Sequence, residues 1–431
     1  MEVLLLFCMV IGLMLIGVPI AVSLGLSSTL FLLWFSESSL ASVAGTLFEA
    51  FEGHYTLLAI PFFILASSFM TTGGVAQRII RFSIACVGHL HGGLAIAGVF
   101  ACMLFAALSG SSPATVVAIG TIVIAGMRQV GYTKDFAAGV IANAGTLGIL
   151  IPPSVLLIVY GVLTQTSVPE LYLAGVLPGI ILAGFFSLMI LTICIVRPQM
   201  GGDRIWATWA ERFHALVDLI PPGVIFLGVI GTIYLGWATP TEAASIGVIL
   251  SIVLAAMNRS LSMEMLMASF EGTVRTTSMI MLIIFAAMIL NIVVGYFGAI
   301  QAASAFIGEL GLSPLQLILL VVVFYLIIGM FMETFSMMLT TIGIVFPLVM
   351  SMGYDPVWFG ILVVLLMETA LITPPIGVNL FVVQGIRFKG APFRDVCIGS
   401  APFVVAMLAL VGLLIWQPGV ATWLPEQVYG R

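Results

Sequence analysis

Long apolar stretches, separated by short polar segments, recur along the whole chain. Residues 171–196, 215–236 and 403–416 are three examples. A helix needs about 20 mainly apolar residues to cross the hydrocarbon core of a bilayer. None of the polar segments is long enough to fold as a separate soluble domain. The pattern therefore predicts an all-α polytopic membrane protein that is embedded in a lipid bilayer.

The composition agrees with this prediction. The 431 residues are 62% hydrophobic and 7% charged, whereas a soluble domain has about 25% charged residues. The net charge of -5 is small and the 13 Lys and Arg residues are scattered, so the chain has no basic face to bind nucleic acid.

The cysteines and the N-terminus carry no sign of secretion or of a zinc site. The five cysteines occur singly, without a C-x-x-C pair, which favours apolar packing over disulfides or zinc; they are Cys8, Cys86, Cys102, Cys194 and Cys397. The chain opens with Glu2 in place of a basic region and has no small-x-small cleavage site, so we expect no cleaved signal peptide.

Several short motifs occur twice, 219 to 222 residues apart. Phe-Glu-Gly at 51–53 returns at 270–272, Gly-Tyr at 131–132 returns at 353–354, and Ile-Pro-Pro at 151–153 is matched by Thr-Pro-Pro at 373–375. Pro19 with Gly25 is likewise matched by Pro240 with Gly247. Repeated motifs in the same order predict a duplicated unit: a first repeat over 1–200, a cytoplasmic linker over 201–214 and a second repeat over 215–431.

The positions of Lys and Arg predict the orientation in the membrane. They fall in segments 78–81, 128–134, 197–212, 259–275 and 387–394, which we expect to be cytoplasmic because basic residues stay on that side. The alternating segments 36–52, 164–170, 236–239, 298–314 and 353–356 lack them and would face the periplasm of a bacterial inner membrane. Residues 3–34 are ambiguous, since Gly17 to Pro19 could divide them into a short helix and a span.

This orientation requires two hairpins that enter the membrane and return. Segment 93–127 has both ends on the cytoplasmic side but is too short for two full spans, and Ser109-Gly110-Ser111-Ser112-Pro113 would form its turn. Segment 315–352 has both ends outside and would turn near 332–336. Duplication combined with reversed sidedness predicts an inverted repeat, as in ion-driven secondary transporters.

A proline-interrupted span follows each hairpin, over 136–163 with Pro152-Pro153 and over 358–386 with Pro374-Pro375. Proline removes an amide donor and costs about 3 kcal/mol or more inside a helix. Such a break persists in lipid only where a ligand, a neighbouring helix or water satisfies the freed backbone groups. Freed carbonyls together with hydroxyls and amide oxygens suit sodium, and helix N-termini beside them favour a carboxylate.

We therefore predict one sodium site in each repeat. The first set of ligands is Ser109, Ser111, Ser112, Thr115, Asn143, Gly145 and Thr146. The second set is Thr334, Ser336, Thr340, Thr341, Thr373, Gly377 and Asn379. Ser112, Pro152, Glu333, Glu368 and Pro375 are candidates for substrate contact or coupling. Any single hydroxyl could instead serve helix packing, and either glutamate could carry a proton or bond a broken helix end.

Four longer motifs resemble the large membrane subunit of tripartite ATP-independent periplasmic (TRAP) transporters. They are L-S-G-S-S-P-A-T from Leu108, N-A-G-T-L-G-I-L-I-P-P-S from Asn143, G-W-A-T-P-T-E-A-A from Gly236 and I-T-P-P-I-G-V-N from Ile372. The resemblance covers nearly the whole chain. It implies a scaffold domain and a mobile transport domain, formed across both repeats, with an elevator-type movement driven by sodium. It also implies a small four-helix membrane subunit, expected as a separate polypeptide, and a periplasmic solute-binding protein.

The sequence thus predicts sodium-coupled uptake of small organic acids, such as a C4-dicarboxylate, a sialic acid or another sugar acid, with no cofactor besides Na+. A proton-coupled carrier or a sodium/proton antiporter of similar fold is the alternative, and a passive channel would also fit the composition. An intramembrane enzyme does not fit, because the chain has no H-E-x-x-H, no G-x-S-x-G and no histidine near Ser109 or Ser112.

Overall fold

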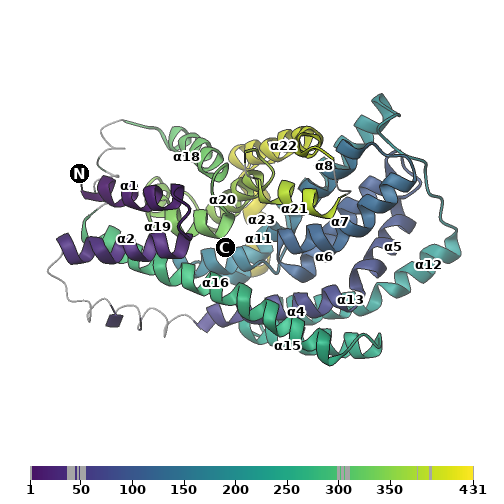
Figure 1. Cartoon of the computed structure of the whole chain (residues 1–431), viewed down its shortest axis with the longest axis horizontal. Coiled ribbons are helices and arrows are strands. Elements are labelled where there is room, and N and C mark those ends of the chain that lie inside the picture. The colour runs from purple at the N-terminus through teal and green to yellow at the C-terminus, as the bar shows by residue number, and fades with distance from the viewer. Residues whose placement is uncertain are drawn as a thin grey trace.

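The computed structural model describes residues 2–35, 55–298, 311–375, 377–387 and 391–430, and the single positions 44, 45, 48, 301 and 305. All regular secondary structure in these parts is helical (Figure 1). Seven of the described helices are long and apolar enough to cross a membrane, or eight if one bent pair is a single span. The all-α polytopic prediction is confirmed. Most of the predicted loops 36–52 and 298–314, the motif at 51–53 and Lys389 lie outside the described residues.

The helices follow the same order in both halves of the chain: a hairpin, a broken helix and a long helix. The first half contains α1 (Glu2–Leu15), α2 (Ile20–Phe35), η1 (Tyr55–Leu58), α4 (Ala59–Thr72), α5 (Val75–Val87), α6 (Gly93–Ser109), α7 (Ser112–Gln129), α8 (Lys134–Ala144), α9 (Leu147–Leu150), α10 (Val155–Thr164) and α11 (Val168–Val196). The second contains α12 (Trp209–Asp218), α13 (Ile220–Phe226), η2 (Leu227–Gly231), α14 (Thr232–Tyr234), α15 (Pro240–Met257), α16 (Met263–Tyr296), α18 (Pro314–Gly329), α19 (Thr334–Ser351), α20 (Pro356–Leu371), α21 (Val378–Ile386), α22 (Phe393–Trp416) and α23 (Gly419–Tyr429). The repeat boundaries and the reversed sidedness stay predictions.

Local sequence signals explain where several of these helices begin. Thr239 accepts a hydrogen bond from the Glu242 amide, and the Glu242 carboxylate accepts one from the Thr239 amide, which forms a capping box ahead of α15. Thr208 and Glu211 form the same box ahead of α12. The predicted linker 201–214 is therefore without regular structure only up to Thr208. At the N-terminus, Gly17 has a φ of 91° and separates α1 from α2.

Two groups of helices lie next to each other, with α2, α16, α4 and α15 running along the lower side of the molecule in Figure 1 and the second group above them and to the right. In the first, α4 packs against α15 and α16 packs against α2 and α4. In the second, α8 packs against α22, α6 against α7 and α11, and α21 against α7 and α8. Helix α20 lies within this second group, and its residues are buried from Val357 to Leu371. The second group thus encloses both proline-interrupted helices.

Candidate functional site

The tip of the α6–α7 hairpin lies against the first proline break. Gly110 connects the two helices in the left-handed conformation, with a φ of 61°. A Cβ atom on Gly110 would lie 2.4 Å from the Pro153 carbonyl oxygen, so both the turn and the close contact require glycine. The chain turns within the predicted segment 109–113.

Hydroxyl groups are concentrated at this tip. Thr115 donates its hydroxyl hydrogen to the Ser111 carbonyl, with a distance of 2.8 Å. Its oxygen lies 2.9 Å from the Ser109 hydroxyl, so Ser109 must be the donor between these two side chains. In that arrangement the Ser109 oxygen keeps its lone pairs for another partner.

The interrupted helix packs directly onto this tip. Helices α8 and α9 are bent by 42° from α10 across the break that contains Pro152-Pro153. A Cβ on Gly145 would lie 2.1 Å from the Val116 side chain, and one on Gly148 would lie 2.8 Å from the Ser111 carbonyl oxygen. The structure therefore brings the predicted first set together.

Two buried amide oxygens lie at this junction. Asn143 donates its side-chain amide to the Gly139 carbonyl, at 2.6 Å. Asn379 donates to the Ser112 hydroxyl, at 2.7 Å, and to the Ala142 carbonyl, at 3.1 Å. The side-chain oxygens of both asparagines are buried and accept no hydrogen bond from the described residues. A buried carbonyl without a donor is costly, so a bound donor or cation would stabilise each of these oxygens.

Asn379 lies with the first set of predicted ligands and not with the rest of the second set, while the assignment of the sodium ligands itself stays a prediction. It belongs to the second repeat and was expected beside Thr334 and Ser336, yet its amide bonds Ser112 in the first hairpin. The reason is the packing of α21, which lies against α7 and α8. The first group of oxygens is therefore built by both halves of the chain.

The remaining residues of the second set are less closely assembled. Thr340 and Thr341 donate to carbonyls one turn earlier in α19, and Thr341 also bonds the Tyr325 hydroxyl of α18. Thr373 donates to the Thr369 carbonyl within its own segment. Among the described residues, none of these hydroxyls bonds Asn379. Gly377 starts α21 in the left-handed region, with a φ of 56°.

The two glutamates have opposite environments. The Glu333 carboxylate caps α19: it accepts bonds from the amides of Phe335 and Ser336 and from the Thr334 hydroxyl. Of the two roles considered for Glu333, carrying a proton or bonding a helix end, the structure shows a bond to a helix end. Glu368 is fully buried in α20, and neither of its oxygens has a hydrogen-bond partner within bonding distance among the described residues.

The two proline pairs also differ, because Pro152 and Pro153 are buried whereas Pro374 and Pro375 are exposed.

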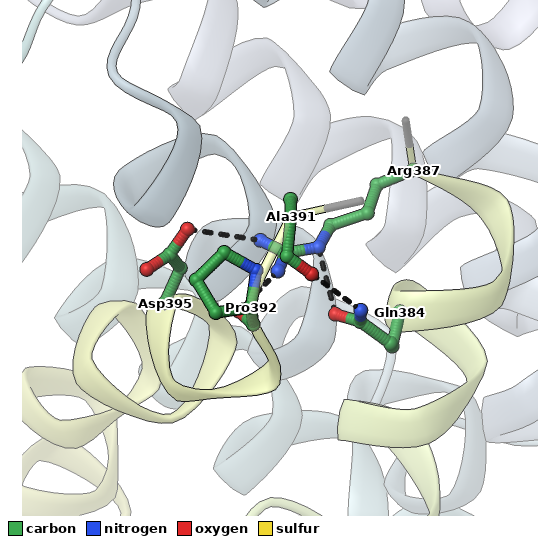
Figure 2. A network of polar contacts seen from close by, with 5 residues as sticks. All are labelled: Gln384, Arg387, Ala391, Pro392 and Asp395. Carbon is green, nitrogen blue, oxygen red and sulfur yellow. Dashed lines mark hydrogen bonds and ion pairs between the residues drawn. The ribbon is translucent and has the colours of Figure 1, made fainter. Parts of the chain in front are cut away.

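Two contributors to this region were missed from the sequence. Ser154 follows the first proline pair and caps α10 by accepting the Leu157 amide; a serine directly before an apolar run is a common N-cap signal. The second is Arg387, which ties α21 to α22 (Figure 2). It donates to Gln384 and to the Pro392 carbonyl, and it lies 3.9 Å from the Asp395 carboxylate. Burial lowers the pKa of the Arg387 guanidinium, and Asp395 opposes that shift.

The donor set fits sodium better than a divalent or transition metal. It consists of hydroxyl, amide and carbonyl oxygens, which are hard and neutral ligands. Within the described ranges, no group of three or more His, Cys, Asp or Glu side chains could hold a metal ion.

Comparisons with known proteins identify relatives across the whole length. The family model described as "Tripartite ATP-independent periplasmic transporter, DctM component" matches residues 7–420. The C4-dicarboxylate TRAP transporter large permease protein DctM of Vibrio cholerae is 46% identical, over 100% of this chain and 99% of the relative. Its namesake from Pseudomonas aeruginosa is 44% identical over 94% of each chain. The sialic acid TRAP transporter large permease protein SiaM of Vibrio cholerae is 31% identical over 97% of each.

The fold also occurs in a solved structure. The Alcanivorax borkumensis YdaH transporter, whose structure is described as having an unusual topology, superimposes with a TM-score of 0.66 over 89% of this chain and 90% of that chain. At 17% identity, the similarity is one of fold alone.

Proposed function

Since the chain belongs to the DctM family of tripartite ATP-independent periplasmic transporters, we propose that it drives uptake of C4-dicarboxylates with a sodium gradient. It is a large permease subunit and a multi-pass protein of the inner membrane. The relatives with the higher identities are named for C4-dicarboxylates, whereas more distant ones are named for isethionate, sialic acid and ectoine. These names support a small molecule with an acidic group as substrate, and those of the relatives with the higher identities favour a dicarboxylate.

The paired, buried amide oxygens of Asn143 and Asn379 carry the sodium proposal. Asn379 bonds the Ser112 hydroxyl and the carbonyl of Ala142, the residue before Asn143, and both side-chain oxygens lack a donor. Loss of a buried polar partner costs about 1–3 kcal/mol, so two such oxygens in one place favour a bound cation. The cation would hold the α6–α7 tip, the first break and α21 together. These three segments would then keep their relative positions only while the cation is bound.

The proposed cycle is an elevator-type movement of the helix group that encloses the breaks, relative to the group formed by α2, α4, α15 and α16. A periplasmic solute-binding protein would deliver the substrate, and a small four-helix membrane subunit would complete the complex. The family name supports a tripartite assembly. The relative from Oleidesulfovibrio alaskensis that is named isethionate TRAP transporter permease protein DctMQ is aligned over 63% of its length, so part of that protein lies outside the aligned region.

The test is uptake into proteoliposomes whose membrane contains this chain and its small subunit. The solute-binding protein, loaded with radiolabelled succinate, is added outside the vesicles. We expect accumulation with an inward sodium gradient and none with an equal potassium gradient. Accumulation that ignores sodium and follows a proton gradient would replace the sodium proposal by the proton-coupled alternative.

A further inference from the structure

Glu368 is a buried acid that the sodium site does not use. It lies one turn before the end of α20, close to the second proline break, and is 0% exposed. Neither carboxyl oxygen has a hydrogen-bond partner at bonding distance among the described residues. The backbone of Leu150, at the end of α9, is a polar neighbour that acts on the charge of the carboxyl from a longer distance. Glu368 therefore lies in the second interrupted helix, next to the end of α9 in the first.

An ionised carboxylate at this position has no ion-pair partner among the described residues, and the backbone of Leu150 is the polar group that would favour its charge. An isolated buried charge is costly enough that such groups become neutral instead. The C-terminal end of α20 carries a partial negative charge, which opposes a second negative charge beside it. The neutral acid is the form that this environment favours.

Charged and titratable groups on the neighbouring helices do not supply the missing partner. Those at the far end of α20 are Asp355, Glu170 and Glu426, which line one small cavity, and Asp355 is 13 residues, or about 20 Å of helix, from Glu368. Glu333 lies at the start of α19, Arg387 at the end of α21, and Arg394 and Asp395 at the start of α22. The remaining ones are Tyr160, Tyr172, Cys194, Tyr325, Cys397 and Tyr429. None of these side chains is among the groups that influence the Glu368 carboxyl.

We propose that Glu368 is a proton-binding site whose proton is exchanged during the transport cycle, so that the carrier moves a proton in addition to sodium. A metal ion at Glu368 is disfavoured, because a hard cation needs several oxygen ligands, and within the described ranges no group of three or more His, Cys, Asp or Glu side chains could hold a metal ion. A purely structural acid would donate its proton to a fixed acceptor, and neither Glu368 oxygen has one at bonding distance. The proposal deepens the proposed function and rests on it for the direction of coupling.

The proton itself can be observed without transport. Infrared spectra of the reconstituted complex at neutral pH should show the carbonyl stretch of a buried, protonated carboxylic acid. We expect the band to be lost in Glu368→Gln and kept in the control Glu271→Gln, whose side chain is on the exposed face of α16. Absence of the band from the wild type, or its persistence in Glu368→Gln, would overturn the proposal even if uptake depends on sodium.

The exchange of the proton is tested in the same vesicles. With a constant sodium gradient, one proton per cycle changes the limiting accumulation by about tenfold per unit of pH gradient. We expect this response in the wild type and in Glu271→Gln, and its loss in Glu368→Gln. Wild-type accumulation that ignores the pH gradient overturns proton exchange. Accumulation that ignores sodium but follows the pH gradient overturns the sodium coupling of the proposed function and leaves proton exchange at Glu368 standing.

Discussion

At the scale of single residues, the two asparagines at the junction should determine the affinity for sodium. Asn143→Ala and Asn379→Ala each remove a buried oxygen that lacks a donor. A bond to a charged group contributes about 1.5–3 kcal/mol, so we expect the sodium concentration for half-maximal uptake to rise roughly tenfold or more. The measurement is initial uptake rate against sodium concentration.

Ser187→Ala is the matched control, because Ser187 donates only to a carbonyl one turn away within α11. We expect an unchanged half-saturation in this variant. If both asparagine variants also keep the wild-type value, the sodium ligands lie elsewhere. A larger effect for Asn379 is consistent with its added bonds to Ser112 and Ala142.

Glu333 should act on stability instead of coupling. Its carboxylate accepts hydrogen bonds from two backbone amides at the start of α19. Loss of an N-cap lowers the stability of a helix or protein by about 0.5–2 kcal/mol. We expect Glu333→Ala to lower the thermal unfolding temperature of the purified complex while the response of uptake to a pH gradient remains. A variant with wild-type stability but no pH response would assign the proton to Glu333 in place of Glu368.

At the scale of helices and turns, the sequence predicts most of what the structure contains. The hydrophobic pattern places the spans, a cluster of glycine, serine and proline marks the first hairpin turn, the polar residues near 332–336 mark the second, and the proline pairs mark both broken helices. The position of Asn379 could not be predicted, because local motifs do not specify which distant helix α21 packs against. The roles of the glutamates also depend on tertiary contacts: the sequence shows two acids in apolar surroundings, and only the fold caps a helix with one and isolates the other.

The turn at Gly110 is the tightest test of how the hairpin tip meets the break. Gly110→Ala places a Cβ within 2.4 Å of the Pro153 carbonyl oxygen in a left-handed conformation, which alone costs roughly 1–2 kcal/mol for a residue other than glycine. We expect uptake to fall at least tenfold, because the tip must move away from the sodium ligands.

Gly184→Ala is its control, since no atom lies within 4 Å of the added methyl group and α11 is helical there. This variant should keep its uptake. Both variants should elute as the intact complex in size-exclusion chromatography. Full uptake by Gly110→Ala would show that the close contact does not serve transport.

At the scale of the whole molecule, the inverted repeat predicts on which side of the membrane each hairpin has its ends. Basic segments flank α6–α7, whereas the segments next to α18–α19 lack them, so the hairpins should open to opposite sides. In a variant free of native cysteines, single cysteines at His91 and Lys134 mark the first hairpin, and those at Leu315 and Ser351 mark the second; all four positions are exposed. A membrane-impermeant maleimide added to spheroplasts should label Leu315→Cys and Ser351→Cys directly, and the other two only after permeabilisation. Labelling of all four from the same side would mean parallel repeats, and the two proline breaks could not then converge from opposite faces on one ion site.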